Sequence, residues 1–122
     1  MLAGGEAEMN KWVGRARHTP GVMNKTEQAY ADHLEAQRIA GEIQSWKFER
    51  VKFKLADKTY YTPDFQVVCK DGVIEYPEVK GHWEDDARVK VKVTAEQFPE
   101  FRFVAVKPIA KKHGGGWERE EF

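Results

Sequence analysis

The chain has 122 residues, and its 20 lysines plus arginines equal its 20 aspartates plus glutamates. This length fits one compact domain, and without a basic excess only a local patch could attract nucleic acid. A single cysteine, Cys69, excludes an internal disulfide and a thiolate metal cluster within one chain, and no run of about 18 apolar residues predicts a membrane span. We therefore expect a soluble cytoplasmic protein with no recognisable export signal.

The first predicted helix begins at Asn24. Residues 1–23 show no sustained periodicity, and we expect them to form a flexible arm. Asn24 and Glu27 then have the spacing of a capping box, in which an N-cap side chain and a glutamate three residues later satisfy each other's backbone N–H groups. Apolar residues follow at helical spacing, and Gly41 is the expected C-terminal stop.

Three strands are expected to follow this helix. The apolar parity changes within Ile43–Leu55, which predicts a strand with a bulge near Glu49 and Arg50. Tyr60–Cys69 and Val73–Lys80 are the next two strands. The intervening Lys70-Asp71-Gly72 contains Asp-Gly, a strong hairpin signal.

The C-terminal third begins with an ambiguous segment. Residues 85–98 alternate as a strand would, but they also fit a helix, and the acids at their start favour the helix because of its dipole. Pro99 ends this helix, and Phe101–Lys107 is a further strand. We thus expect a folded domain over 24–108, followed by a tail, 109–122, with a glycine hinge and an aromatic-acidic end that docks on the body or on another chain.

The second hairpin carries charges at positions that face each other. If Gly72 takes the left-handed position of a three-residue loop, Cys69 pairs with Val73 and Asp64 falls opposite Glu78. Like charges directly opposite each other are destabilising, so this pair of carboxylates calls for a compensating cation.

These side chains have the chemistry of a metal site. Asp64 and Glu78, with the Val79 carbonyl and waters, would make a hard-oxygen site suited to Mg²⁺ or Mn²⁺. Lys80 projects on the same face as Glu78, where it would orient or deprotonate an attacking water or hold a phosphate oxygen. The alternative is that these charges only solvate an exposed strand face. Pro77 removes a ladder donor, and it indicates a bulge that re-aims Glu78.

The pattern Pro63-Asp64 followed by Glu78-Val79-Lys80, after a helix that carries Glu27, resembles the PD-(D/E)XK nuclease superfamily. The expected order of elements is similar to that superfamily's αβββαβ core, an α/β (α+β), restriction-endonuclease-like fold whose mixed sheet is flanked by helices. The resemblance covers about residues 24–107. The runs MNKTEQAY, YTPDF and EVKG look most like small phage-encoded nucleases of the endonuclease I and Holliday-junction-resolvase type.

The resemblance implies roles for individual residues. Asp64 and Glu78 would be metal ligands, Lys80 the catalytic lysine and Glu27 an additional acid, although helix capping also accounts for Glu27. The cofactor would be Mg²⁺, with Mn²⁺ as a substitute and no organic cofactor. The residues expected to contact DNA are basic and lie on the two helices: Lys25, Arg88, Lys90 and Lys92. An ordinary solvated basic face is the competing interpretation of the last three.

The function that follows is a Mg²⁺-dependent DNA endonuclease that hydrolyses phosphodiester bonds in branched DNA. We expect it to act as a homodimer, because a junction presents two cleavage positions related by symmetry. The expected location is the cytoplasm, that of the bacterial host if the protein is phage-encoded, with no membrane partner. Three alternatives remain open: a nicking or restriction-like enzyme on duplex DNA, an RNA-directed nuclease, and a non-catalytic DNA-binding module.

Overall fold

A computed structural model describes residues 21–81 and 85–122. Residues 1–20, most of the predicted arm, lie outside the described residues. In chain order the elements are α2 (Lys25–Ile39), β1 (Ile43–Phe48), β2 (Phe53–Ala56), β3 (Thr59–Tyr61), β4 (Phe65–Cys69), β5 (Ile74–Val79), α3 (Asp85–Gln97), β6 (Arg102–Pro108), the 3-10 turn η1 (Lys111–His113) and β7 (Trp117–Glu121).

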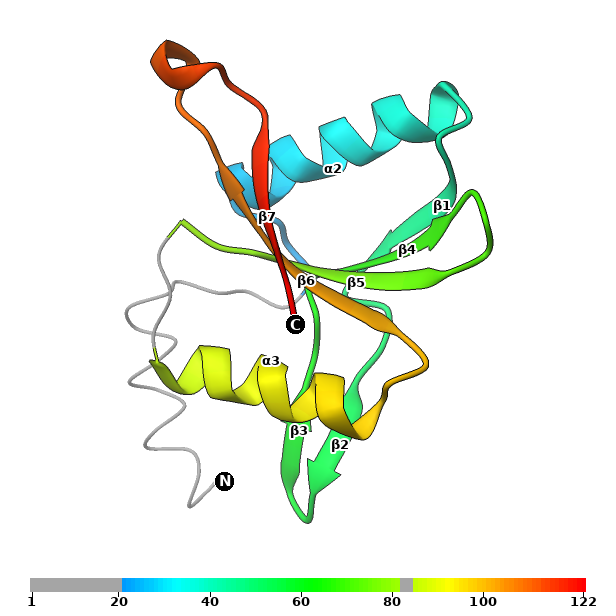
Figure 1. The fold of residues 1–122 in the computed structure, drawn as a ribbon, viewed down its shortest axis with the longest axis vertical. Helices are drawn as coiled ribbons and strands as arrows, with labels where there is room; N and C mark the ends of the chain where they lie inside the picture. The colour runs from blue at the N-terminus through cyan, green and yellow to red at the C-terminus, as the bar shows by residue number, and fades with distance from the viewer. Residues whose placement is uncertain (1–20, 82–84) are drawn as a thin grey trace.

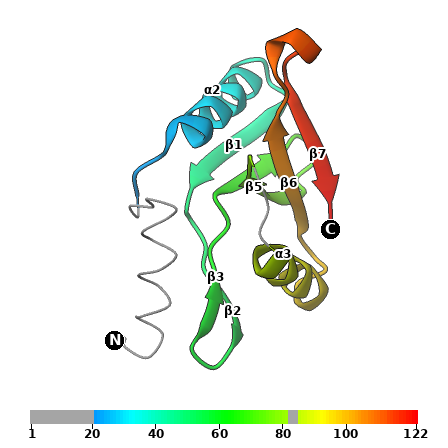
Figure 2. The same cartoon turned by 90° about the vertical axis from the view of Figure 1, so that its left-hand side faces the viewer.

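Five strands form one mixed sheet between two helices (Figure 1 and Figure 2). The strand order is β1-β4-β5-β6-β7; β5 and β6 are parallel, and the other neighbours are antiparallel. Alternate residues of the sheet pack on opposite helices, Val104 in the core under α2 and Phe103 in the core beside α3. This architecture confirms the predicted α+β class. Neither of the described α-helices is long and apolar enough to cross a membrane.

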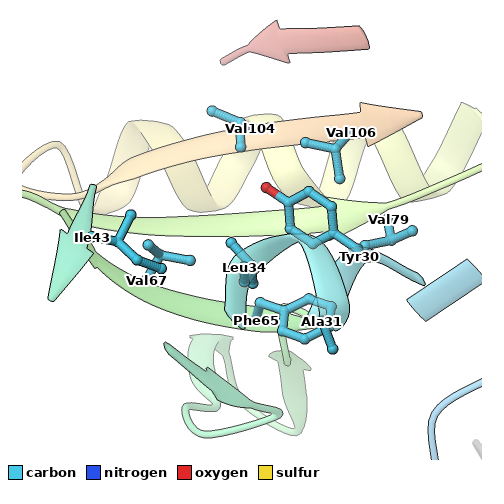
Figure 3. Close-up of a cluster of buried hydrophobic side chains, with 9 residues drawn as sticks. All are labelled: Tyr30, Ala31, Leu34, Ile43, Phe65, Val67, Val79, Val104 and Val106. Carbon is cyan, nitrogen blue, oxygen red and sulfur yellow. The ribbon is translucent and has the colours of Figure 1, made fainter. Parts of the chain in front are cut away.

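The predicted capping box is present at the start of α2. The Asn24 side chain accepts a hydrogen bond from the Glu27 N–H at 2.8 Å, and Glu27 Oε1 accepts one from the Asn24 N–H at 2.9 Å. Past the end of the helix, Gly41 has a φ of +78°, a conformation that glycine adopts without strain. The buried face of α2 packs on the sheet in the cluster of Figure 3: Tyr30, Ala31, Leu34, Ile43, Phe65, Val67, Val79, Val104 and Val106.

The prediction of one bulged strand over Ile43–Leu55 is wrong. β1 ends at Phe48, and Glu49 follows with a φ of +48°, which turns the chain out of the sheet. The chain then forms a separate two-stranded hairpin, β2–β3, before β4 returns to pair with β1. The predicted strand Tyr60–Cys69 is also divided, because Pro63 lies between β3 and β4 and has no N–H for a ladder.

The C-terminal segment 109–122 adds a strand, β7, to the sheet. β7 pairs antiparallel with β6 from Val104–Glu121 to Pro108–Trp117, and Phe122 packs against the core beside α3. The tail therefore docks on the body, one of the two outcomes expected from its composition. The folded domain was expected to end at residue 108, but β7 extends the sheet beyond that residue.

Candidate active site

The hairpin between β4 and β5 has the predicted register. The Cys69 N–H donates to the Val73 carbonyl at 2.8 Å, and Gly72 has a φ of +90° in the loop between them. Continuing this register places Asp64, just before β4, opposite Glu78. The Cα partners further along follow the same count: Val67 with Glu75 and Val68 with Ile74.

Pro77 interrupts the hydrogen-bond ladder between β4 and β5 beside these two acids. The Val79 N–H points to the β4 side, where it donates to Asp64 Oδ2 at 2.8 Å, whereas the Lys80 N–H donates to a β6 carbonyl. Successive N–H groups of a strand alternate in direction, so Pro77 is the residue whose missing N–H would face β4. Its pairing with Val104 of β6 continues without a register shift, so the predicted bulge is not found there.

The two carboxylates join the strands where the ladder is open. Glu78 Oε1 accepts hydrogen bonds from the Asp64 N–H at 3.2 Å and from the Tyr61 hydroxyl at 2.7 Å. Its other oxygen lies 3.4 Å from Lys80 Nζ. Asp64 and Glu78 are 8% and 7% exposed, whereas the Lys80 side chain is 32% exposed. The acids are thus buried next to a lysine that reaches solvent.

Burial dominates the electrostatics of this group. It raises the pKa of Asp64 and of Glu78, and the charge of Glu78 raises the pKa of Asp64 further. For Lys80, burial acts to lower the pKa, but the charges of Glu78 and Asp64 outweigh it and the pKa is raised. Two buried acids beside one lysine retain an excess of negative charge when ionised, which favours the binding of a further cation.

Glu27 lies close enough to this group to act on it. It is buried at the first turn of α2, and its charge raises the pKa values of Asp64 and Lys80. The same carboxylate caps the helix, since its Oε1 accepts the Asn24 N–H. Capping and proximity to the acid pair therefore coexist in one residue.

Tyr61 belongs to the site, although the sequence did not indicate it. In a continuous strand its side chain would point away from that of Asp64, because residues three apart lie on opposite faces. The break at Thr62 and Pro63 removes this parity and lets the Tyr61 hydroxyl reach Glu78. Burial and the charge of Glu78 hold the pKa of Tyr61 well above its ordinary value. The hydroxyl therefore stays protonated and donates a hydrogen bond to Glu78.

The predicted basic residues do not form one surface. Lys25 is exposed on the first turn of α2. On α3, the Nη1 and Nη2 groups of Arg88 donate hydrogen bonds to the two carboxylate oxygens of Glu120 on β7. Lys90 and Lys92 are exposed, but at 100° per residue Lys90 points away from the side that Arg88 and Lys92 share.

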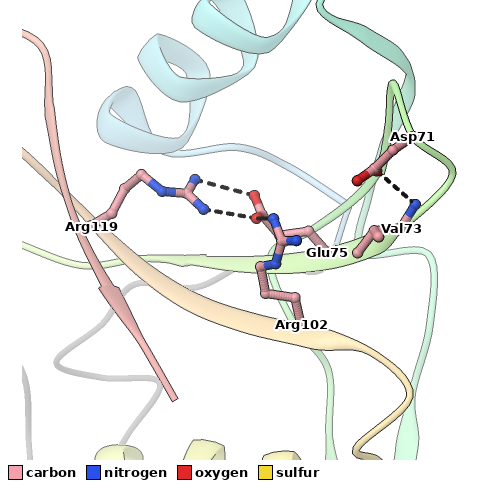
Figure 4. A network of polar contacts seen from close by, with 5 residues as sticks. All are labelled: Asp71, Val73, Glu75, Arg102 and Arg119. Atoms are coloured by element: carbon pink, nitrogen blue, oxygen red, sulfur yellow. Dashed lines mark hydrogen bonds and ion pairs between the residues drawn. The ribbon is translucent and has the colours of Figure 1, made fainter.

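Glu75 lies on the opposite face of the sheet, as expected from its parity. It is 4% exposed and accepts hydrogen bonds from Arg119 of β7 at 2.8 and 3.2 Å and from Arg102 of β6 at 3.3 Å (Figure 4). A cavity of about 280 Å³ beside this network is also lined by α2 residues, including Tyr30. Glu75 therefore ties three strands together and takes no part in the acid pair.

The donor atoms of the acid pair fit a hard cation. Within residues 21–81 and 85–122, no group of three or more His, Cys, Asp or Glu side chains has the arrangement of a metal site. Mg²⁺, however, is commonly bound by one or two carboxylates with waters completing its shell. Asp64 Oδ2 accepts the Val79 N–H, and no described residue donates to Oδ1. The contact that Val79 makes here is through its N–H, not through the carbonyl expected to bind a metal.

Among known proteins, the chain is similar to a family whose description assigns no activity. The family described as "Protein of unknown function (DUF1064)" matches residues 21–113, which is 93 of the 122 residues. The match includes Glu27, Asp64, Glu78 and Lys80 and ends before β7. No curated protein and no solved structure matches the chain.

Proposed function

Because the chain belongs to the DUF1064 family, whose description names no activity, we propose from the site alone that it is a Mg²⁺-dependent DNA endonuclease. The observation that carries the proposal is the buried acid pair, in which Asp64 and Glu78 bond across two strands with Lys80 3.4 Å from the second carboxylate. Two acids able to hold a metal ion, with a lysine beside them, are groups that can catalyse the hydrolysis of a phosphodiester.

Each side chain has a distinct role in the proposed reaction. Asp64 and Glu78 would hold the ion, Mg²⁺ or Mn²⁺, which when bound supplies Lewis acidity and a more acidic water. The Lys80 ammonium would offset negative charge on the scissile phosphate, and its exposure leaves it within reach of a substrate. Tyr61 would fix the orientation of Glu78 through its 2.7 Å hydrogen bond. Hydrolysis uses water, so no organic cofactor is required.

The finer proposal is a structure-selective enzyme that resolves branched DNA. It is supported by the resemblance of residues 24–107 to small phage resolvases, and it includes a homodimer that makes two symmetric cuts. The corresponding location is the cytoplasm, that of the bacterial host for a phage-encoded protein. A nicking or restriction-like activity on duplex DNA would use the same site residues.

We expect the protein to cut four-way junctions in Mg²⁺ in preference to forked, single-stranded or linear duplex DNA of matched sequence. Gel assays with each substrate, in Mg²⁺, in Mn²⁺ and in EDTA, measure this preference. EDTA should stop cleavage. Preference for linear duplex would replace the junction proposal with the restriction-like one, and a fully active Lys80→Ala variant would remove Lys80 from the mechanism.

A non-catalytic DNA-binding module is the second candidate, and one observation favours it. Both oxygens of Glu78 have protein partners, in Tyr61, Asp64 and Lys80, so these contacts alone could serve to hold the strands together. Mg²⁺ titration by calorimetry separates the candidates. An enzyme should show binding that Glu78→Ala removes, whereas a non-catalytic module should show none.

We expect Glu27→Gln to lower the cleavage rate about tenfold or more while leaving stability within about 0.5 kcal/mol. Glutamine serves in a capping box as well as glutamate does, so the helix start is kept, but the charge near Asp64 is lost. Cleavage kinetics and urea unfolding measure the two effects. Asn24→Ala is the control: it removes the cap, at about 1 kcal/mol, and keeps the acid. If Glu27→Gln cleaved DNA at the wild-type rate, Glu27 would act only as a helix cap and not in catalysis.

A further inference from the structure

We propose that the β2–β3 hairpin is a basic arm that binds the phosphate backbone of duplex DNA beside the acid pair. The inference rests on the proposed function only for the identity of the ligand. It is drawn from the charge, exposure and position of the hairpin, which the sequence had not singled out as a DNA contact.

Positive charge is concentrated in the hairpin and in residues 50–52, which lead into β2. Residues 50–60 hold four basic side chains, Arg50, Lys52, Lys54 and Lys58, and one acid, Asp57, which gives a net charge of 4 − 1 = +3. The whole chain has a net charge of zero, so the remaining residues sum to −3. The hairpin is thus the kind of local patch that a neutral chain needs in order to attract a polyanion.

Lys52 and Lys54 lie on the face of the hairpin turned away from the protein, and Arg50 and Lys58 are also exposed. Phe53 and Tyr61 are Cα partners and pack inward with Val91 of α3. On the outward face, Lys54 is the partner of Tyr60, and both are exposed. Lys52 Nζ lies 4.3 Å from the centre of the Tyr60 ring. One face of the hairpin therefore fixes it to the protein and leaves the other available to a ligand.

These four charges are not neutralised within the described part of the chain. No described carboxylate lies within ion-pair distance of Arg50, Lys52, Lys54 or Lys58. Arg88 on α3, in contrast, is occupied by Glu120. Uncompensated surface cations are those that release counterions from DNA on binding, so these four side chains suit a phosphate backbone better than Arg88 does.

The hairpin is connected directly to the site. Its last residue, Tyr61, donates to Glu78, and the turn at Lys58 lies three residues away. At about 3.4 Å per residue this is about 10 Å, or roughly three base-pair steps. A duplex whose backbone reached the acid pair would therefore pass within reach of the hairpin lysines.

The test is binding of a linear duplex to the full chain in EDTA, where cleavage does not interfere. Fluorescence anisotropy over about 50 to 200 mM KCl gives the slope of log affinity against log salt. We expect the double variant Lys54→Ala, Lys58→Asn to weaken binding and to reduce the magnitude of this slope by about 1.8, since each lost phosphate contact removes about 0.9. Asparagine is chosen at residue 58 because Lys58 has a φ of +57°, which asparagine tolerates.

The matched control is Lys111→Ala, Lys112→Ala. It removes the same charge from η1, at the opposite end of the molecule from the hairpin (Figure 1 and Figure 2), and it should leave the slope within about 0.5 of the wild type. Equal slopes for hairpin variant and wild type would overturn the proposal. So would equal DNA binding combined with weaker binding to phosphatidylserine vesicles, which would indicate a membrane surface instead.

The outcome is independent of the test for catalysis. DNA binding through the hairpin without cleavage in Mg²⁺ or Mn²⁺ would refute the nuclease and support the arm. Cleavage that is lost in Lys80→Ala, with a salt slope that the hairpin variant does not change, would support the nuclease and refute the arm.

Discussion

Asp64→Asn is expected to reduce DNA cleavage by at least about a thousandfold, equivalent to about 4 kcal/mol of transition-state stabilisation. Asp64 Oδ1 accepts no hydrogen bond from a described residue, and an amide at this position offers one neutral oxygen where the carboxylate offered two charged ones. Single-turnover cleavage with saturating enzyme isolates this loss from any change in DNA affinity.

The same substitution should make the metal-free protein more stable. Asp64 is buried beside Glu78, and removing one of two facing negative charges is worth up to about 1 kcal/mol, or roughly 4 °C in Tm. The asparagine carbonyl still accepts the Val79 N–H, so the strand connection is kept. Thermal unfolding in EDTA measures the change.

Asp71→Asn is the matched control for both measurements. Asp71 is an exposed aspartate in the next loop, where its Oδ1 accepts the Val73 N–H at 3.1 Å, a bond that asparagine preserves. It should change neither cleavage nor stability by a measurable amount. If Asp64→Asn instead unfolded the protein at lower temperature and cleaved normally when folded, Asp64 would be a structural acid and the proposed site would be wrong.

The parts of the fold that could be predicted from the sequence are those specified by short-range chemistry. The capping box needs only Asn24 and Glu27 at the right spacing, and the structure contains both of its hydrogen bonds. Asp71-Gly72 sets the length of a loop, and loop length sets the register that brings Asp64 opposite Glu78. The acid pair was thus predictable because one turn fixes it.

The β2–β3 hairpin could not be predicted in this way. The alternation of Val51, Phe53 and Leu55 predicts a strand of the main sheet. No neighbouring residue in the sequence indicates that these side chains pack in the cluster beside α3 instead. The departure depends on the backbone of Glu49, a residue type that gives no signal for a positive φ. Tyr61 was missed for the same reason, since its direction depends on where β3 ends.

β7 was missed because its stabilising contacts are distant in sequence. WEREEF has no apolar alternation, and its exposed edge is strongly charged, which is typical of a solvated tail and also of a protected edge strand. What distinguishes the two is pairing with β6 and the ion pair between Arg119 and the buried Glu75, 44 residues away. Neither partner can be identified before the sheet order is known.

Phe65→Ala is expected to lower the free energy of unfolding by about 3 to 5 kcal/mol. Phe65 is 1% exposed, and its ring centroid lies 5.4 to 6.0 Å from the ring centroids of Tyr30, Phe48 and Trp46. Truncation therefore removes contacts with both α2 and β1. A small domain has only about 5 to 15 kcal/mol of stability in total, so the urea midpoint should fall by a large fraction at unchanged slope. Val89→Ala, at a residue 57% exposed on α3, should change stability by less than about 0.5 kcal/mol.

Phe65 and Asp64 are adjacent in the chain, yet their expected effects are opposite, and this contrast tests the assignment of both. Phe65→Ala should unfold easily but cleave DNA at low temperature, because the acid pair, Lys80 and the β4–β5 loop are intact in the molecules that remain folded. Asp64→Asn should be the more stable variant and inactive. A Phe65→Ala cost below about 1 kcal/mol would mean that this ring is not packed between α2 and β1, and the position of Asp64 at the start of β4 would then lose its support.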